Sequence, residues 1–155
     1  MKTLVGLVNE DLAAAQDNSL KTKSQPAVVD PALVKQIKDL LSSFEKTPLN
    51  RRLVTSGMGV LRYYACHEED AHPLLTTPEA VRILWDTMQL HFEENDCLED
   101  FVTILMCLTE KAEERASMQQ GLPLYGIQLL AKCRHRVDKG SRAHRALSVL
   151  IKRMG

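Results

Sequence analysis

The sequence lacks an excess of either charge, because 20 lysines and arginines balance 20 aspartates and glutamates among 155 residues. It also lacks long apolar runs, and none approaches the roughly 20 residues that span a bilayer. Zero net charge with 45% apolar residues argues against a disordered chain and against general nucleic-acid binding. A chain of this length buries roughly 70% of its unfolded surface, so one domain is stable without a disulfide or a metal. We predict a cytoplasmic protein with no membrane segment, and the nucleus is the alternative compartment.

Few residues are of the kinds that carry chemistry. The four cysteines are unevenly spaced and form no Cys-X-X-Cys pair, which indicates reduced, buried thiols rather than disulfides or a zinc site. Cys66-His67 and His72 offer a thiol and imidazoles but no second ligand cluster at zinc spacing. Cys133-X-His135 lies in a basic stretch that could lower a thiol pKa, but a helix-terminal, buried or half-buried cysteine explains it better than a nucleophile does. His91 stands alone at a helical position that we expect to be exposed. Since a glycine-rich phosphate loop and a nucleophile elbow are also absent, we predict no enzyme activity, no cofactor and no metal.

Helix signals recur along the chain, and no segment shows sustained strand alternation, so we predict an all-α fold. A polar residue before a proline predicts helix starts at Asp30-Pro31, Thr47-Pro48 and Thr77-Pro78, because proline at the first helical position loses no hydrogen bond. Further helix boundaries are predicted at the Asp96–Glu99 capping box, Gly121, Leu122-Pro123 and Ser141.

Three residues inside the predicted helices indicate how these helices pack. Gly57 and Gly59 each weaken the second predicted helix by about 1 kcal/mol relative to alanine, which indicates a close helix–helix contact or a kink. Trp85 lies on the apolar stripe of its helix, where we expect it to fill the core.

The first 29 residues differ from the rest of the chain. Thr3–Ala15 carries a weaker apolar stripe that predicts a short helix, and residues 16–29 are polar and typical of a flexible connector. We therefore divide the chain into an N-terminal part, 1–29, and a helical domain, 30–155.

Two sets of apolar residues recur with a similar period. Leucines 61, 105 and 147 lie at the centres of similar segments and are 44 and 42 residues apart. Ile37, Leu84 and Ile127 are central to the proline-initiated helices and are 47 and 43 residues apart. Two independent markers with nearly the same period indicate an internal repeat of two or three helices.

These segments resemble the armadillo form of the armadillo/HEAT helical repeats. In that resemblance, residues 68–75 match the short first helix of a repeat, 78–90 the second, 96–109 the third, and 113–123 the next short helix with its turn. The resemblance implies a right-handed α-solenoid over about residues 31–155, with about two full repeats and partial repeats at either end. A bundle of amphipathic helices without repeat order is the alternative.

Similarity to armadillo proteins implies that a partner binds along a groove formed by the third helix of each repeat. In importin-like members, ladders of tryptophan and asparagine on these helices hold an extended peptide. The tryptophan positions are here occupied by Gly59, Thr103 and Arg145, and the asparagine positions by Tyr63, Cys107 and Val149. Because the ladders are absent, the resemblance implies a different partner.

Charge is segregated along the chain although it sums to zero. Residues 68–100 contain ten acids and one base, Arg82, whereas residues 132–155 contain eight bases and one acid, Asp138. Such segregation can steer a charged partner or support self-association between the two segments. Solvated polar faces and favourable helix-dipole positions are the alternative explanation. No aromatic residues interleave the basic segment, so we do not expect nucleic-acid binding.

We therefore predict a non-catalytic adaptor that binds another protein or peptide along its helical surface. Arginine and tyrosine side chains on the groove helices and at the basic end are the candidate contacts. The candidate partner-binding residues are Arg62, Tyr63 and Arg145 on the groove helices, and Arg134, Arg136 and Arg142 at the basic end.

Two alternatives remain open for the function. In the first, the chain is a terminal structural fragment of a longer solenoid, because it begins inside a repeat and ends directly on a helix. In the second, it is a transcription-related helical bundle, because Thr55–Gly59 and Leu84-Trp85 distantly resemble the N-terminal bundle of transcription elongation factor S-II.

Overall fold

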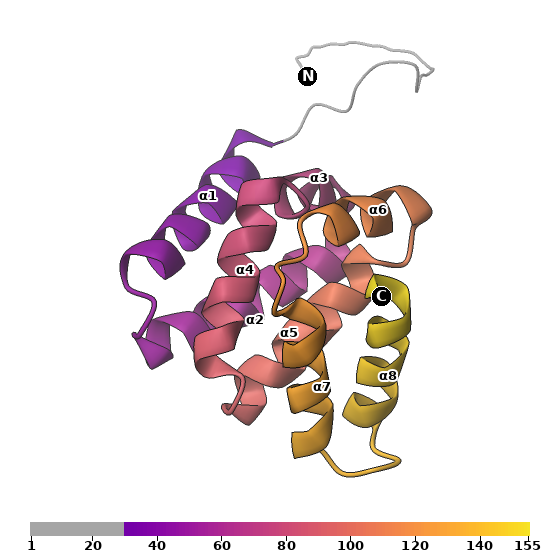
Figure 1. Ribbon diagram of the computed structural model, residues 1–155. Coiled ribbons are helices and arrows are strands. Elements are labelled where there is room, and N and C mark those ends of the chain that lie inside the picture. Colours follow the sequence, from indigo (N-terminus) through magenta and orange to yellow (C-terminus); the bar gives the residue numbers. More distant parts are fainter. Residues whose placement is uncertain (1–29) are drawn as a thin grey trace. The chain divides into compact units, whose positions relative to one another are not determined.

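The computed structural model describes residues 30–155, and every regular element in that range is helical (Figure 1). The prediction of an all-α fold is confirmed for these residues. The helix predicted over Thr3–Ala15 and the connector predicted over 16–29 lie outside them. The elements in chain order are α1 (Pro31–Lys46), α2 (Arg51–His67), the 3-10 helix η2 (Glu69–Ala71), α3 (His72–Leu75), α4 (Pro78–His91), α5 (Asn95–Leu108), α6 (Ala112–Gln120), α7 (Gly126–Arg136) and α8 (Arg142–Met154).

The predicted starts of α1, α4 and α8 are confirmed. α1 begins at Pro31. Thr77 Oγ1 accepts a hydrogen bond from the Ala80 amide at 3.2 Å, and Ser141 Oγ accepts one from the His144 amide at 3.1 Å. Each of these side chains therefore satisfies an amide that has no partner within its own helix.

The predicted start of α2 at Thr47-Pro48 is wrong. α2 begins at Arg51, because Asn50 Oδ1 accepts a hydrogen bond from the Leu53 amide at 3.1 Å. The Thr47 hydroxyl instead donates to the Ser43 carbonyl at 2.9 Å and closes the end of α1. Asn50, three residues after Thr47, therefore caps the start of α2 in place of Thr47.

Two further predicted starts are also wrong. α5 begins at Asn95, so Asp96 lies in its first turn, where a carboxylate is favourable beside the helix N-terminus. α7 begins at Gly126, and Leu122-Pro123 belongs to a preceding turn in which the Pro123 carbonyl accepts the Gly126 amide at 2.9 Å. α5 thus begins one residue before the predicted cap, whereas α7 begins after the turn that holds its predicted start.

The helices fall into three successive groups: α1 with α2, then η2 with α3, α4 and α5, then α6, α7 and α8. α2 packs against α5, and α5 packs against α8, so the last helix of each group lies beside the last helix of the next (Figure 1). α1 packs in the same way against α4, while α6 contacts both α4 and α8. The arrangement sets α2, α5 and α8 side by side in one row.

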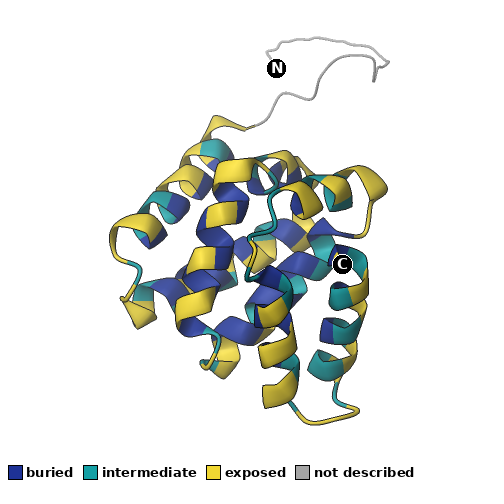
Figure 2. Cartoon of the chain, in the orientation of Figure 1, coloured by how far each residue is buried: buried dark blue, intermediate teal, exposed yellow. Residues whose placement is uncertain are grey.

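The core lies where α2, α4 and α5 meet. Trp85 on α4 and Phe101 on α5 are fully buried, and their rings meet edge to face with centroids 5.1 Å apart, a favourable arrangement for aromatic pairs. The predicted core role of Trp85 is confirmed. Leucines 61, 105 and 147, which mark the period in the sequence, are also fully buried. Figure 2 shows buried residues concentrated on α4 and α5, while α6 is mostly exposed.

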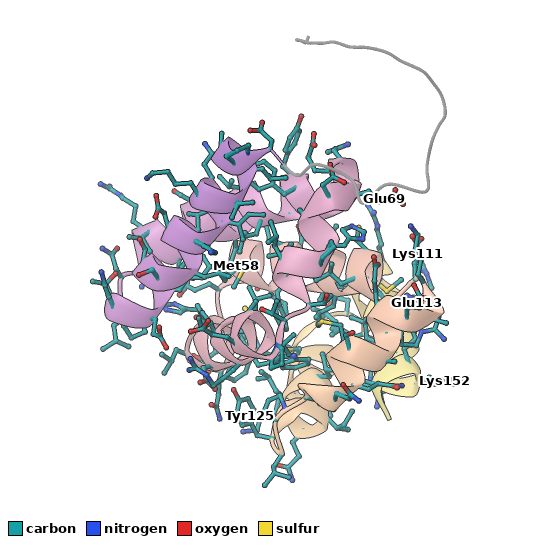
Figure 3. All side chains as sticks on the ribbon, turned by 90° about the horizontal axis from the view of Figure 1, so that it is seen from above. Met58, Glu69, Lys111, Glu113, Tyr125 and Lys152 are labelled. Carbon is teal, nitrogen blue, oxygen red and sulfur yellow. The ribbon has the colours of Figure 1, made fainter. Side chains whose placement is uncertain are left out.

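Side-chain interactions between the groups join residues 37 to 47 positions apart, and most of them join residues 41 to 44 positions apart. His72 Nδ1 lies 2.9 Å from Glu114 Oε1, 42 residues on, and Lys111 forms an ion pair with Glu69, also 42 residues away (Figure 3). Others at separations of 41 to 44 are Thr55 with Cys97, Cys66 with Cys107, Pro48 with His91, Glu93 with Arg136, and Thr109 with Arg153. Neighbouring groups therefore pack against each other in a common register.

Gly57 allows α1 to approach α2 closely. A Cβ atom on Gly57 would lie 2.5 Å from Cε1 of Phe44, whose side chain on α1 is fully buried. A Cβ atom on Gly59 would meet only Oδ2 of Asp100, at an ordinary contact distance of 3.7 Å. The predicted close contact is confirmed at Gly57, and Gly59 has room for a side chain.

We expect Gly57→Ala to lower the free energy of unfolding by about 1–3 kcal/mol, because the buried Phe44 ring must move to admit the methyl group. Gly59→Ala is the matched control on the same helix. It should raise the free energy of unfolding by up to about 1 kcal/mol, because alanine favours a helix and fits without displacement. Urea denaturation of both variants beside the wild type measures the difference. Equal changes in the two variants would contradict the packing role of Gly57.

Candidate partner-binding groove

A groove of about 590 Å³ lies between α2, α5 and α8. The groove lies along the row of α2, α5 and α8 because all three helices contribute residues to its lining. The apolar part of its lining consists of Val102 and Met106 on α5 with Ala143, Ala146 and Val149 on α8. The charged part consists of Arg62 on α2, Glu99 on α5, and Arg142 and Arg145 on α8. The groove therefore combines an apolar surface with a surplus of positive charge.

Two of the three groove arginines are held by interactions within the chain. Arg62 Nε lies 3.3 Å from Oδ1 of Asp100, whose side chain is 15% exposed, so this ion pair joins α2 to α5 beside the groove. Arg145 Nη1 donates to the carbonyl of Gly140. Gly140 has φ of +83°, which glycine adopts without strain in the turn before α8. Arg142 is exposed and, within residues 30–155, its side chain has no ion pair or hydrogen bond.

The structure brings three of the six predicted partner-binding residues together. Arg62, Arg142 and Arg145 all line the groove. Tyr63 is next to Arg62 in the chain but lies outside the lining, and it is 56% exposed. Its ring centroid is 4.7 Å from that of His67, one helical turn further on. Tyr63 is therefore on the outer side of α2 rather than in the groove.

Arg134 and Arg136 belong to α7 and also lie outside the groove. Arg134 Nη1 is 3.4 Å from Ser148 Oγ on α8, and Arg136 Nη2 donates to the Glu93 carbonyl at 2.9 Å. These hydrogen bonds tie α7 to its neighbours, which gives both guanidinium groups a role within the fold.

Each of the three groove helices contributes to the lining two residues that are four positions apart. The pairs are Arg62 and Cys66 on α2, Thr103 and Cys107 on α5, and Arg145 and Val149 on α8. The alignment made from the sequence identifies the pairs on α5 and α8. On α2 the groove is lined by Arg62 and Cys66, each three residues after the positions that the resemblance implies, Gly59 and Tyr63. Leu61 and Leu105 are both buried and 44 residues apart, whereas Cys66 lies beside Cys107, 41 residues on, which accounts for the difference of three residues.

Several acids of the segment 68–100 are paired within the chain. Besides Glu69 and Asp100, Glu94 lies 3.5 Å from Arg51, and Asp86 accepts a hydrogen bond from the Tyr125 hydroxyl at 2.5 Å. Arg51 and Arg62 are on α2, while Lys111 and Tyr125 immediately precede α6 and α7, so the acids contribute to packing between elements. Their charge is correspondingly less available for self-association with the segment 132–155, which stays a prediction.

The expectation that His91 is exposed is wrong. His91 is buried, and its Nε2 atom lies 2.6 Å from the carbonyl oxygen of Pro48 in the turn between α1 and α2. The prediction of buried thiols is confirmed for Cys97 and Cys133, but it is wrong for Cys66, which is exposed, and Cys107 is half-buried. Within residues 30–155, no three histidine, cysteine or acidic side chains gather in a way that could hold a metal ion.

No family model, curated protein or solved structure matches this chain. The helices between residues 30 and 155 include none that is long and apolar enough to cross a membrane.

We expect the Asp100 carboxyl to titrate above the ordinary value of about 3.9, because burial raises its pKa more than Arg62 lowers it. Since its folded pKa exceeds its unfolded pKa, Asp100 favours folding below the unfolded value, and this contribution is lost as the pH rises through the folded value. Arg62→Ala removes the nearest positive charge and should raise the pKa of Asp100 further. Carboxyl-carbon NMR titration of both proteins measures the shift. A lower pKa of Asp100 in the variant would contradict the ion pair.

Proposed function

We propose that this chain is a non-catalytic adaptor of the armadillo/HEAT type, whose groove between α2, α5 and α8 binds an acidic segment of a partner protein. The observation that carries the proposal is the presence of Arg62, Arg142 and Arg145 around one apolar floor. The three arginines come from two helices 80 or more residues apart in the chain, so their convergence depends on the fold rather than on a local cluster.

The repeat assignment is supported by the helix order and by the spacing of contacts. Residues 68–109 and 111–154 each hold a short helix followed by two longer ones, and α1 with α2 precede them as an incomplete unit. In a stack of similar repeats each residue meets a residue about one repeat away, so a nearly constant contact spacing is expected. The interactions at separations of 41 to 44 fit that expectation better than a bundle of unlike helices. We therefore propose a right-handed α-solenoid of two full repeats after a partial one.

The chemistry of the groove suits carboxylates flanking an apolar side chain. A guanidinium group binds a carboxylate through two parallel hydrogen bonds. The groove lining contains three guanidinium groups and one carboxylate, that of Glu99. Val102, Met106 and Val149 form the floor, and Val149 is 39% exposed, so an apolar side chain of the partner has a surface to cover. A basic peptide would meet repulsion here, which agrees with the absence of the tryptophan and asparagine ladders.

The state of the thiols supports a non-catalytic role. The cysteine nucleophiles of enzymes commonly have a lowered pKa, which keeps the thiolate populated at neutral pH. Burial together with the neighbouring Cys66 raises the pKa of Cys107 to about 12, and burial raises the pKa of Cys133 to about 11.

The test uses peptides selected from a random library on the immobilised protein, with one selected peptide labelled by fluorescein. We expect selection of sequences with two or more acids around an apolar residue. Anisotropy should show that Arg142→Glu with Arg145→Glu weakens binding at least about 10-fold, because attraction becomes repulsion. Added sodium chloride should weaken binding to the wild type by screening the same charges.

The matched control is Lys132→Glu with Lys139→Glu, which makes the same charge change on exposed residues outside the groove. We expect this control to keep most of the affinity. An equal loss in both double variants would move the binding surface to the basic end as a whole. Selection of no acidic sequence would contradict the proposed partner chemistry.

A further inference from the structure

Two cysteines from different helices face each other beside the groove. Cys66 is in the last turn of α2 and Cys107 in the last turn of α5, and their Sγ atoms are 3.1 Å apart. Both side chains line the groove, and Cys66 is exposed to solvent. A disulfide requires an Sγ–Sγ distance of about 2.05 Å, so the two sulfur atoms need to approach by only about 1 Å.

The other two cysteines lack this access. Cys97 is fully buried, and its Sγ atom lies 3.2 Å from Thr55 Oγ1. Cys133 is fully buried on α7. Only the pair at the groove therefore combines two adjacent thiols with an opening through which a small reagent can reach one of them.

We propose that Cys66 and Cys107 form a dithiol modification site, which a small-molecule disulfide such as oxidised glutathione converts to an intramolecular disulfide joining α2 to α5. A zinc site is not favoured, because structural zinc takes four ligands and the described residues bring no third ligand to this pair. The pair is set by the stacking of α2 on α5, which aligns residues 41 positions apart.

The reaction proceeds through two thiol–disulfide exchanges. The Cys66 thiolate attacks one sulfur of oxidised glutathione, which forms a mixed disulfide on Cys66 and releases one glutathione thiolate. The Cys107 thiolate then attacks Sγ of Cys66, which forms the internal disulfide and releases the second glutathione. Both protein thiols are oxidised, one glutathione disulfide is reduced to two thiols, and the two protons leave with these thiols.

The order of the two steps follows from exposure and is supported by the electrostatics of the pair. Cys66 is the sulfur that the reagent can reach, while Cys107 is half-buried. Burial raises the pKa of the Cys107 thiol, and the neighbouring Cys66 sulfur raises it further. The contribution from Cys66 as a thiolate disappears once Cys66 is in a mixed disulfide. The first step therefore prepares Cys107 for the second.

The disulfide would change the groove as well as the fold. It would close a loop of about 40 residues and so restrict the unfolded chain. It would also fix the distance between α2, which carries Arg62, and α5, which carries the apolar floor. The reduced and oxidised forms would thus differ in how freely α2 and α5 move relative to each other along the groove.

The test treats the reduced, folded full-length chain with excess oxidised glutathione, removes the glutathione, alkylates the remaining thiols with N-ethylmaleimide in denaturant so that buried thiols also react, and measures the intact mass. Wild type should lose two of its four alkylatable thiols, retain no glutathione and yield one cross-linked peptide containing Cys66 and Cys107. Dithiothreitol should restore all four thiols. Cys107→Ser should stop at a single glutathione on Cys66, and Cys66→Ser should not react while folded. Cys133→Ala is the control that should oxidise like the wild type.

A second measurement needs no variant. Oxidation should raise the melting temperature of the wild-type monomer by roughly 5 °C or more, and reduction should reverse the change. Four free thiols after treatment, a retained glutathione on wild type, or a cross-link between two chains or through Cys97 or Cys133 would overturn the proposal. None of these readouts requires a bound peptide, so the outcome is independent of the proposed function.

Discussion

The stacking of α2, α5 and α8 is the constraint on which the rest of this structure depends. Each helix buries one face in the core and turns a second face toward the same groove, and the side-chain interactions between successive groups join residues 37 to 47 positions apart, most of them 41 to 44 apart. The Arg62–Asp100 ion pair, the groove arginines and the facing thiols of Cys66 and Cys107 are all consequences of that register. A shift of one helical turn would separate every one of these groups.

Features controlled by short-range chemistry could be predicted from the sequence. Thr77 and Ser141 cap their helices because the hydroxyl and the amide it accepts from are three residues apart, a distance that does not depend on the rest of the fold. Trp85 lies on an apolar stripe, so its burial follows from helical periodicity. The period near 42 residues was likewise visible in the spacing of buried leucines.

Features that depend on contacts between distant residues could not be predicted in the same way. His91 looks like an isolated polar residue until the Pro48 carbonyl, in the turn between α1 and α2, is brought within hydrogen-bond distance of its ring. The choice of Asn50 over Thr47 as a cap depends on how α1 ends. Leu61 and Leu105 are both buried, but burial alone does not say which turn of a helix faces the groove, and so Arg62 and Cys66 were missed as a pair.

The middle group, η2 with α3, α4 and α5, has a position that differs from those of its neighbours. In the part of the chain that the structure describes, no hydrogen bond or ion pair joins α1 or α2 directly to α6, α7 or α8, whereas the middle group is joined to both. Local unfolding can therefore begin at either outer group while the middle group stays folded, because each outer group packs against only one neighbouring group. Amide protons of α4 and α5 are thus placed to exchange with solvent most slowly, and the middle group is the part through which a disturbance at one end reaches the other.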